Sequence, residues 1–306
     1  MDPHTTVAVV VPTLNAAQLW PSFHRALVAQ IPQPRRIIVI DSSSTDRTAQ
    51  LATDAGYELY SIAQTDFDHG GTRQLAIELL SDARVVVFLS QDTMLAAPDA
   101  LSQLVDRFAD PHVGAAYGRQ LPRHEATPIE AHARYFNYPG TSELRDLSSR
   151  DRLGFKAIFI SNSFAAYRRD ALMSVGGFPK NVLFGEDTIT AAKLLKANWK
   201  IAYVAEARAY HSHAYTWTEE FKRYFDIGVL HNREAWLLKE FGQTTAEGRR
   251  FVGSEISYLL SKDWSLIPSA FIRTGLKLLG YRLGRREHRL AASTKRRLSM
   301  QPSYWS

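Results

Sequence analysis

Polar side chains that could do chemistry stand directly after three runs of branched apolar residues in this 306-residue chain. Thr13 and Asn15 follow the first run, Asp41 follows the second, and Gln91 and Asp92 follow the last. A carboxylate in the position of Asp41 can accept hydrogen bonds from a nucleobase N–H or a ribose hydroxyl. Asp92 suits Mg²⁺ or Mn²⁺ bridged to a diphosphate. Either acid can also serve only to cap the turn that follows it.

A glycine-rich segment, HGGTR at residues 69–73, is a second candidate for ligand binding. Its glycines let a backbone approach a ligand closely, and the N-terminus of the helix that follows favours anions. Arg73 adds a guanidinium that suits phosphate oxygens. The pattern lacks the spacing of a Walker loop, and a plain glycine turn beside a surface arginine is the alternative.

Two adjacent acids and two later histidines complete the set of candidates. Glu186 and Asp187 open a predicted helix, where the helix dipole keeps carboxylates ionised, as a general base requires. Helix capping alone would also explain them. His211 and His213 end a predicted strand, and their spacing of two residues puts them on one face. A neutral imidazole there could complete a metal site with Asp92 or could be structural.

Strand-like and helix-like segments alternate along the chain and must position these residues. The segments predicted as strands are residues 7–11, 36–40, 57–62, 84–89, 113–118, 157–167 and 200–210. The segments predicted as helices are residues 15–30, 46–56, 70–80, 170–175 and 186–197. This alternation predicts an α/β fold, a mostly parallel, doubly wound sheet with helices on both faces and ligands at one edge. Residues 121–154 read as a long irregular connection, which is uncommon unless it binds something.

The pattern becomes helical beyond residue 216. We therefore expect a catalytic domain over residues 1–215 and a helical, basic C-terminal extension over residues 216–306. Residues 262–306 carry a net charge of +8, whereas the other 261 residues carry −2. Apolar and basic residues interleave over residues 266–289, which fits an interfacial helix on anionic lipid. A solvated tail, a nucleic-acid surface or a homo-oligomer interface would be the other uses.

The composition excludes several classes of protein. With 45% hydrophobic and 22% charged residues, the chain is neither disordered nor fibrous. It contains no cysteine, which excludes a disulfide framework, a thiolate zinc site and a cysteine nucleophile. The polar start at residues 1–4 predicts no secretory signal. No stretch reaches the roughly 18 consecutive apolar residues of a spanning helix. We expect a soluble or surface-attached protein, which is compatible with the cytoplasm.

In their order and spacing, these segments resemble the family 2 glycosyltransferases with the GT-A fold, over residues 7–213. The segments that carry this resemblance are VPTLN (11–15), IDSSSTD (40–46), FLSQD (88–92), GGF (176–178), GED (185–187) and His211. Within the family, the chain is most similar to bacterial rhamnosyltransferases that use dTDP-L-rhamnose. The segments that carry this closer likeness are FDHGGTR (67–73), FLSQD (88–92), GRQLP (118–122) and FNYP (136–139).

The resemblance implies an inverting transfer of L-rhamnose from dTDP-L-rhamnose to a hydroxyl of a bacterial surface glycan or lipid-linked acceptor. Asp187 would be the catalytic base with Glu186 beside it, and Asp92, His211 and His213 would bind Mg²⁺ or Mn²⁺. The donor-binding residues implied are Pro12, Thr13, Asn15, Asp41, Ser43, Gly71, Arg73, Gln91 and Asp92. The acceptor-binding residues implied are Arg119 and Asn162.

The sequence departs from the family at Ser90, where the first acid of the D-x-D metal motif would stand. This departure concerns the need for a metal ion and how tightly it is held. A family 2 transferase with a UDP- or GDP-linked donor is one alternative function, and a non-catalytic nucleotide-sugar or glycan-binding protein is another. The intact Asp187 argues against the second. A nucleotidyltransferase would carry a glycine-rich loop where this chain has residues 12–15. No nucleic-acid recognition motif is present, so nucleic acid is not an expected partner.

Overall fold

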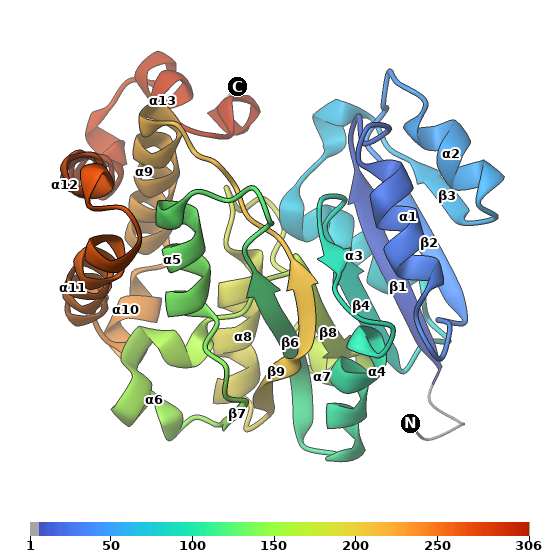
Figure 1. Cartoon of the computed structure of the whole chain (residues 1–306). Helices are drawn as coiled ribbons and strands as arrows, with labels where there is room; N and C mark the ends of the chain where they lie inside the picture. Colours follow the sequence, from blue (N-terminus) through green and yellow to red (C-terminus); the bar gives the residue numbers. More distant parts are fainter. Residues whose placement is uncertain (1–5, 306) are drawn as a thin grey trace.

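A computed structural model describes residues 6–305, and the expectation about a secretory signal falls on residues outside that range. Within the described residues, nine strands form one sheet in the order β3-β2-β1-β4-β8-β6-β9-β5, with β7 paired to β9 (Figure 1). The strands are β1 (Val7–Thr13), β2 (Arg36–Asp41), β3 (Glu58–Ser61), β4 (Val85–Leu89), β5 (Met94–Leu95), β6 (Val113–Leu121), β7 (Glu143–Arg145), β8 (Phe164–Arg168) and β9 (Lys200–Tyr210).

The N-terminal half of the sheet is parallel, as the alternation of strands and helices predicts. β1 pairs in parallel with β2 and β4, and β2 pairs in parallel with β3. The other half is mixed, which corrects the expectation of a mostly parallel sheet. β8 runs antiparallel to β4 and β6, and β5 and β7 run antiparallel to β9, although β6 and β9 are parallel. The apolar pattern marks a strand but does not state the direction in which the strand enters the sheet.

Helices cover both faces of the sheet, because alternate residues of each strand point to opposite sides. Val9 and Val11 pack with α1 (Trp20–Val28), α2 (Thr48–Asp54) and α4 (Ala100–Val105). Val10 and Phe88 pack on the other face with α3 (His69–Leu79), α7 (Arg169–Ser174), α8 (Glu186–Lys196) and α10 (Ala235–Phe241). Burial on both faces explains why these strands read as continuous apolar runs. The predicted α/β class with helices on both faces is confirmed.

Three local predictions were wrong. Residues 121–154 are ordered as α5 (Pro128–Asn137), β7 and α6 (Ser149–Leu153), and α5 begins with a Thr127–Glu130 capping box. That Thr-x-x-Glu spacing was visible in the sequence. The strand predicted at residues 157–167 begins only at β8 and is preceded by a 3₁₀ helix (Gly154–Ile158). Helix α1 begins at Trp20 after Leu19, and Asn15, which was predicted to cap it, lies five residues before with a left-handed backbone, φ 50°.

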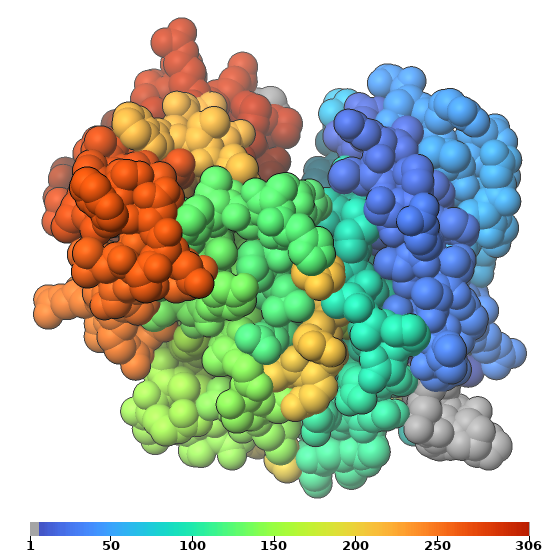
Figure 2. Space-filling model, in the orientation of Figure 1, coloured from blue at the N-terminus to red at the C-terminus, as the bar shows by residue number. Residues whose placement is uncertain are grey.

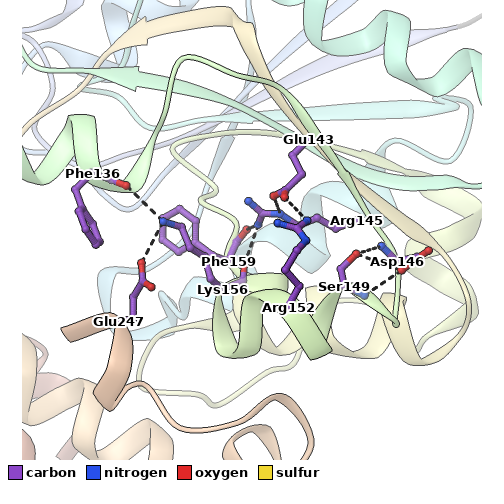
Figure 3. A network of polar contacts seen from close by, with 9 residues as sticks. All are labelled: Phe136, Glu143, Arg145, Asp146, Ser149, Arg152, Lys156, Phe159 and Glu247. Carbon is purple, nitrogen blue, oxygen red and sulfur yellow. Dashed lines mark hydrogen bonds and ion pairs between the residues drawn. The ribbon is translucent and has the colours of Figure 1, made fainter. Parts of the chain in front are cut away.

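The chain beyond residue 216 is helical, as predicted. Its longer helices are α9 (Trp217–Arg233), α10, α11 (Thr245–Lys262), α12 (Ile267–Gly284) and α13 (Ala292–Leu298). Together they stand beside α5 on the side of the molecule away from α1 and α2 (Figure 1). Lys156 connects them to the rest of the chain, since its Nζ donates to Glu247 Oε1 of α11 at 3.2 Å and to Phe136 O at 3.4 Å (Figure 3). No helix in residues 6–305 is long and apolar enough to cross a membrane.

Two basic residues of α12 do not face outward, which corrects the expectation of an interleaved basic and apolar surface. Arg273 Nη1 lies 3.1 Å from Glu220 Oε1 of α9, and Lys277 Nζ lies 3.6 Å from the same oxygen. Two glycines fix this close helix pair, because a Cβ on Gly280 or Gly284 would lie 2.4 or 2.0 Å from backbone oxygens of α9. The inward face of α12 is therefore the charged one.

Candidate active site

The carboxyl ends of β1 and β2 meet, and Asp41 organises the loop that follows them. Thr13 Oγ1 donates to Asp41 Oδ1 at 3.1 Å. The Ser44 N–H donates to Asp41 Oδ2 at 2.8 Å, and the Ser44 hydroxyl donates to Oδ1 at 2.5 Å. Thr13 and Asp41 are buried, and Pro12 lies beside Ile40 in the register of the two strands. Asp41 thus accepts three hydrogen bonds from within the protein and holds the loop at this end of the sheet.

Two short polar residues with left-handed backbones hold the same loop. Asn15, at φ 50°, accepts from the Thr45 N–H through its side-chain oxygen at 2.8 Å. Ser43, at φ 57°, donates its hydroxyl to Ile62 O at 2.8 Å and is exposed. Asn tolerates this conformation better than most residues because its side chain bonds locally. Both residues stand at the strand-end edge where the sequence predicts donor binding.

Gln91 connects this edge to the end of β4. Its Oε1 accepts from the Leu14 N–H at 2.8 Å, and its Nε2 donates to Leu14 O at 3.1 Å. Hydrogen bonds to both the N–H and the C=O of Leu14 fix the backbone after β1 against the backbone after β4. Asp92, the next residue, is thereby held at a defined distance from Thr13 and Asp41.

Asp92, His211 and His213 form the one cluster of metal-ligating side chains in the described residues, with ligand atoms all within 4.8 Å of one another. His211 Nε2 lies 3.4 Å and His213 Nδ1 lies 3.8 Å from Asp92 Oδ2. Burial acts to raise the pKa of Asp92, whereas the neighbouring His211, His213 and Arg123 act to lower it, and Arg123 keeps its positive charge when both imidazoles are neutral. The carboxyl is therefore an anion at neutral pH, ready to bind a cation.

The hydrogen bonds around His211 test whether these residues fit a metal ion. His211 Nδ1 lies 2.9 Å from Gln120 Oε1, and the same oxygen accepts from Arg134 Nη1 at 2.7 Å. Because a guanidinium only donates, this oxygen is an acceptor, and Nδ1 of His211 carries the proton. His211 Nε2 then turns a lone pair toward the Asp92 carboxylate. Burial lowers the pKa of His211 and disfavours a second proton, so the arrangement fits a divalent cation between the two groups.

Glu186 is a buried anion with a cationic partner. Helix α8 begins at Glu186, after Gly185, whose φ of 81° suits glycine. Arg73 Nη1 lies 3.0 Å from Glu186 Oε1, and Asn162 Nδ2 donates to the same oxygen at 2.9 Å. Burial acts to raise the pKa of Glu186, and the nearby Arg73 and His69 lower it overall. Glu186 therefore stays ionised beside Asp187.

Asp187 differs from its neighbour because it has no cationic partner in the described ion pairs. It accepts from the Thr188 N–H at 2.7 Å and from the Asn162 N–H at 3.4 Å, and it is partly exposed. Burial and then the charge of Glu186 raise the pKa of Asp187 to about 7. A carboxylate with this proton affinity can take a proton from a hydroxyl group, which is the property of a general base.

A continuous chain of contacts joins the metal cluster to the acidic pair. Gln120 Nε2 donates to Ser161 Oγ at 2.9 Å, and the next residue, Asn162, holds Glu186 and Asp187. With the Gln91 contacts, this chain runs from Asp41 through Asp92 to Asp187. The structure thus brings three acids, separated by up to 146 positions in the chain, to one edge of the sheet.

Three predicted site residues have partners inside the protein. The position of a Cβ on Gly71 lies 2.7 Å from the Asp68 carboxylate, which caps α3. Arg73 is buried, lies 3.0 Å from Glu186 Oε1 through Nη1, and also donates to His69 O at 2.8 Å. Arg119 donates Nε to Tyr138 O at 3.1 Å.

Sequence reasoning missed the residues that support the metal cluster. Gln120 is buried and bonds to His211, and Arg134 bonds to Gln120. Arg123 donates Nη2 to Asp92 O at 2.6 Å. The signal in the sequence was the polar residue Gln120 near the end of the mostly apolar strand β6, next to the charged Arg119.

Comparison with known proteins gives close relatives. The profile of "Glycosyl transferase family 2" matches residues 8–176. The chain is 46% identical to the O-antigen chain rhamnosyltransferase RfbN of Salmonella typhimurium, over 98% of this chain and 96% of that protein. It is 43% identical to the O-antigen chain rhamnosyltransferase WbaN of Salmonella anatum, over 97% of this chain and 95% of that protein.

Solved structures share the fold at low sequence identity. The mannosyltransferase PcManGT from Pyrobaculum calidifontis, in complex with GDP-Man and Mn²⁺, has a TM-score of 0.58 and 20% identity, over 99% of this chain and 86% of that one. S. aureus TarS 1–349 in complex with UDP-GlcNAc has a TM-score of 0.52 and 14% identity, over 93% and 92%. These likenesses confirm the predicted fold. The family profile and the full-length relatives agree, and the chain is a glycosyltransferase that belongs to glycosyl transferase family 2.

Proposed function

We propose that the protein transfers L-rhamnose from dTDP-L-rhamnose to a hydroxyl of a lipid-linked bacterial surface glycan, with inversion at the anomeric carbon. The observation that carries the chemistry is Asp187, a carboxyl of raised pKa on the same polar network as Asp92. The two O-antigen chain rhamnosyltransferases, 46% and 43% identical over nearly the whole chain, support the sugar and the class of acceptor.

The transfer is a single displacement. Asp187 accepts the proton of the acceptor hydroxyl, and the acceptor oxygen forms a bond to the anomeric carbon. The bond from that carbon to the diphosphate oxygen breaks, and dTDP leaves with the electron pair. Glu186, held ionised by Arg73, keeps a negative charge beside Asp187 and so increases its proton affinity. One displacement inverts configuration, so a β-L-rhamnosyl donor gives an α-L-rhamnoside.

The remaining site residues take roles in binding. Asp92, His211 and His213 would hold Mg²⁺ or Mn²⁺, and the bound ion would stabilise negative charge on the leaving diphosphate. Arg123, next to Asp92, adds a permanent positive charge at the same place. The nucleoside would lie along the loop edge at Pro12, Thr13, Asn15, Asp41, Ser43 and Gln91. Arg119 and Asn162 stay proposals for the acceptor side, as do Gly71 and Arg73 for the donor.

The proposed location of the protein follows from a lipid-linked acceptor, because such an acceptor lies in a membrane. The protein would act in the cytoplasm, peripheral on the inner face of the cytoplasmic membrane. Residues 1–215 would form the catalytic domain, and residues 216–306 would be an extension that serves this attachment.

A donor screen tests the proposal. The purified protein is incubated with a lipid-linked glycan acceptor and dTDP-L-rhamnose, or with UDP- and GDP-sugars, and release of the nucleoside diphosphate is followed. We expect turnover with dTDP-L-rhamnose and an α-linkage in the product by NMR. Turnover with a UDP- or GDP-sugar alone would overturn the donor assignment. Nucleotide-sugar binding without release under any condition would contradict the mechanism.

A further inference from the structure

The outward face of α12 and the turn before it is strongly apolar. Half of the large hydrophobic side chains that are well exposed in residues 6–305 fall within residues 260–279. They are between 45% and 73% exposed, and they are Leu260, Trp264, Phe271, Ile272, Leu278 and Leu279. We call this set the apolar face. Isolated exposed hydrophobic residues are ordinary on protein surfaces, but a contiguous group marks an interaction surface.

The helical period shows that the face is continuous along α12. At 100° per residue, Phe271, Ile272, Leu278 and Leu279 fall within an arc of about 120°. Pro268 and Gly275 lie in the same arc and are exposed. No charged residue interrupts the arc until Arg282, near the end of the helix.

Contacts with α9 fix the rotation of α12 about its axis, and these contacts keep the apolar face exposed. Arg273 and Lys277, with side chains 19% and 15% exposed, point to Glu220 on the opposite side. Gly280 and Gly284 contact the backbone of α9 on that side as well. Turning the apolar face inward would expose Glu220 without its partners and drive Cβ-bearing positions into α9. The fold thus keeps these apolar side chains in contact with water, which is unfavourable. A partner that covers them would remove this unfavourable hydration.

The charges around the apolar face identify the partner. Of the two acids in residues 262–306, Glu287 is buried and bonded to Arg233 and Lys295, and Asp263 is half-buried. The exposed Lys and Arg residues of the same region are Lys262, Arg282, Arg286, Arg289, Arg296 and Arg297. A second copy of this face would bring like charges together, whereas an anionic surface is complementary. Trp264, the most exposed of the set, is a residue typical of the membrane–water interface.

We infer that the apolar face docks on an anionic lipid bilayer and inserts its side chains among the lipid headgroups and upper acyl chains. Helix α12 has 18 residues, a length of about 27 Å at 1.5 Å per residue, and lies along the membrane surface. The attachment is mainly apolar, with the arginines beyond residue 281 adding attraction to anionic headgroups. Space-filling atoms of α11 and α12 stand out at the edge of the molecule beside α5 (Figure 2).

This inference names the surface through which the protein attaches to the membrane. It rests on the proposed function for the identity of that membrane, but it does not depend on the donor or on the chemistry of transfer. Its test needs no substrate. The protein is sedimented with vesicles of phosphatidylethanolamine and phosphatidylglycerol, and with vesicles of phosphatidylcholine alone. We expect preferential binding to the anionic vesicles that persists in part at high salt, because apolar insertion is not screened.

A double variant, Phe271→Gln with Leu278→Gln, removes apolar area without touching the contact with α9. We expect its partition onto anionic vesicles to fall by about tenfold or more, as loss of two inserted side chains requires. Met173→Gln is the matched control, because it changes an exposed hydrophobic residue of α7 that does not belong to the apolar face. This variant should bind as the wild type does. Arg282→Gln with Arg286→Gln should weaken binding at low salt and leave the high-salt binding unchanged.

Three results would overturn the inference. The first is a wild-type protein that does not sediment with anionic vesicles. The second is unchanged binding by the Phe271→Gln, Leu278→Gln variant. The third is a dimer in sedimentation equilibrium without lipid that this variant converts to a monomer, which would assign the face to a second copy of the chain. The rate of transfer to a water-soluble acceptor analogue should be equal in the variant and the wild type. A failure of membrane docking can therefore be distinguished from a failure of the proposed chemistry.

Discussion

Glu186 and Asp187 are neighbours in the chain, yet their surroundings give them opposite acid–base behaviour. Glu186 has the Arg73 guanidinium at 3.0 Å and a donor from Asn162, which together hold its pKa down. Asp187 has only backbone donors and the Thr188 hydroxyl, and the negative charge of Glu186 raises its pKa. Pairs of acids whose surroundings push their pKa values apart are typical of acid–base sites.

Asp187→Asn should remove catalysis and keep donor binding. We expect the transfer rate to fall by about 10²-fold or more, since that is the usual contribution of a general base. Donor affinity, measured by calorimetry, should be unchanged. Asp151→Asn is the control, because the Asp151 side chain is 84% exposed and should leave the rate unaltered. Turnover at the wild-type level by Asp187→Asn would remove Asp187 from the role of base.

The pKa of Asp187 also predicts two pH dependences of opposite sign. The rate of the wild type should rise with pH through about 7, as the base loses its proton. Stability should change the other way, because a pKa raised by folding favours the protonated folded form. This contribution is fully present below the ordinary aspartate pKa of about 4 and is lost as pH rises toward 7. Asp187→Asn should therefore raise the melting temperature above pH 7, and this gain should shrink toward pH 4.

Gln120 is a positioning residue for the metal cluster. Gln120→Leu removes the acceptor for His211 Nδ1 and for Arg134, so His211 loses its defined tautomer. We expect Mn²⁺ affinity, measured by calorimetry without donor, to fall by about 10- to 100-fold. Gln120→Glu keeps an oxygen acceptor at the same place and should retain most of the affinity. Equal loss in both variants would indicate a packing defect and would contradict the positioning role.

At the scale of elements, the contact of α12 with α9 decides which side of α12 faces outward. Gly284 allows the two backbones to touch, since a Cβ there would lie 2.0 Å from Phe225 O. Gly275, in the same helix, has nothing within 4 Å of its Cβ position. Close packing on α9 therefore requires a glycine at position 284 but not at position 275. The sequence alone does not distinguish the two positions.

Gly284→Ala should force the helices apart and destabilise the protein by about 1–3 kcal/mol, as overpacking usually does. Gly275→Ala is the matched control. It should be neutral or should stabilise the protein by up to about 1 kcal/mol, because alanine is the better helix former. Urea unfolding of both variants measures the difference. A Gly284→Ala protein as stable as Gly275→Ala would show that α12 does not pack on α9 at this distance.

At the scale of the whole molecule, the last residues of the chain return to the catalytic part. Trp305 packs with Leu183 and Phe225, and the Met300 N–H donates to Asp226 at 2.8 Å. Leu183 lies in the segment that leads directly into Glu186 and Asp187. Residues 216–306 are therefore in contact with the segment before the acidic pair, as well as with α5 through α11.

Trp305→Ala should cost about 3 kcal/mol of stability, near the lower end for a large aromatic residue removed from a core. Trp264→Ala removes the same side chain from an exposed position and should leave the free energy of unfolding nearly unchanged. Thermal unfolding of the two variants in the absence of lipid gives the comparison. Equal stability of both would mean that the C-terminal residues do not close on the catalytic part.

The sequence determined the local structure of this protein and the list of candidate residues. Continuous apolar runs must be buried on both faces, and this placed β1, β2 and β4 and put Asp41 and Asp92 at or just after their ends. The apolar residues of 200–210 likewise placed β9, with His211 directly after it. The GED segment likewise placed Glu186 and Asp187 at the start of a helix. These inferences depend on periodicity and neighbouring residues, which a single chain displays directly.

Only the tertiary structure decided which candidate touches which. It paired Arg73 with Glu186 rather than with the surface, made Gln120 the support of His211, and turned Arg273 and Lys277 inward. Each of these contacts joins residues far apart in the chain, and each depends on a helix rotation or a strand direction that hydrophobic pattern does not contain. For the same reason, the apolar face of α12 became visible only once its charged side was matched to Glu220.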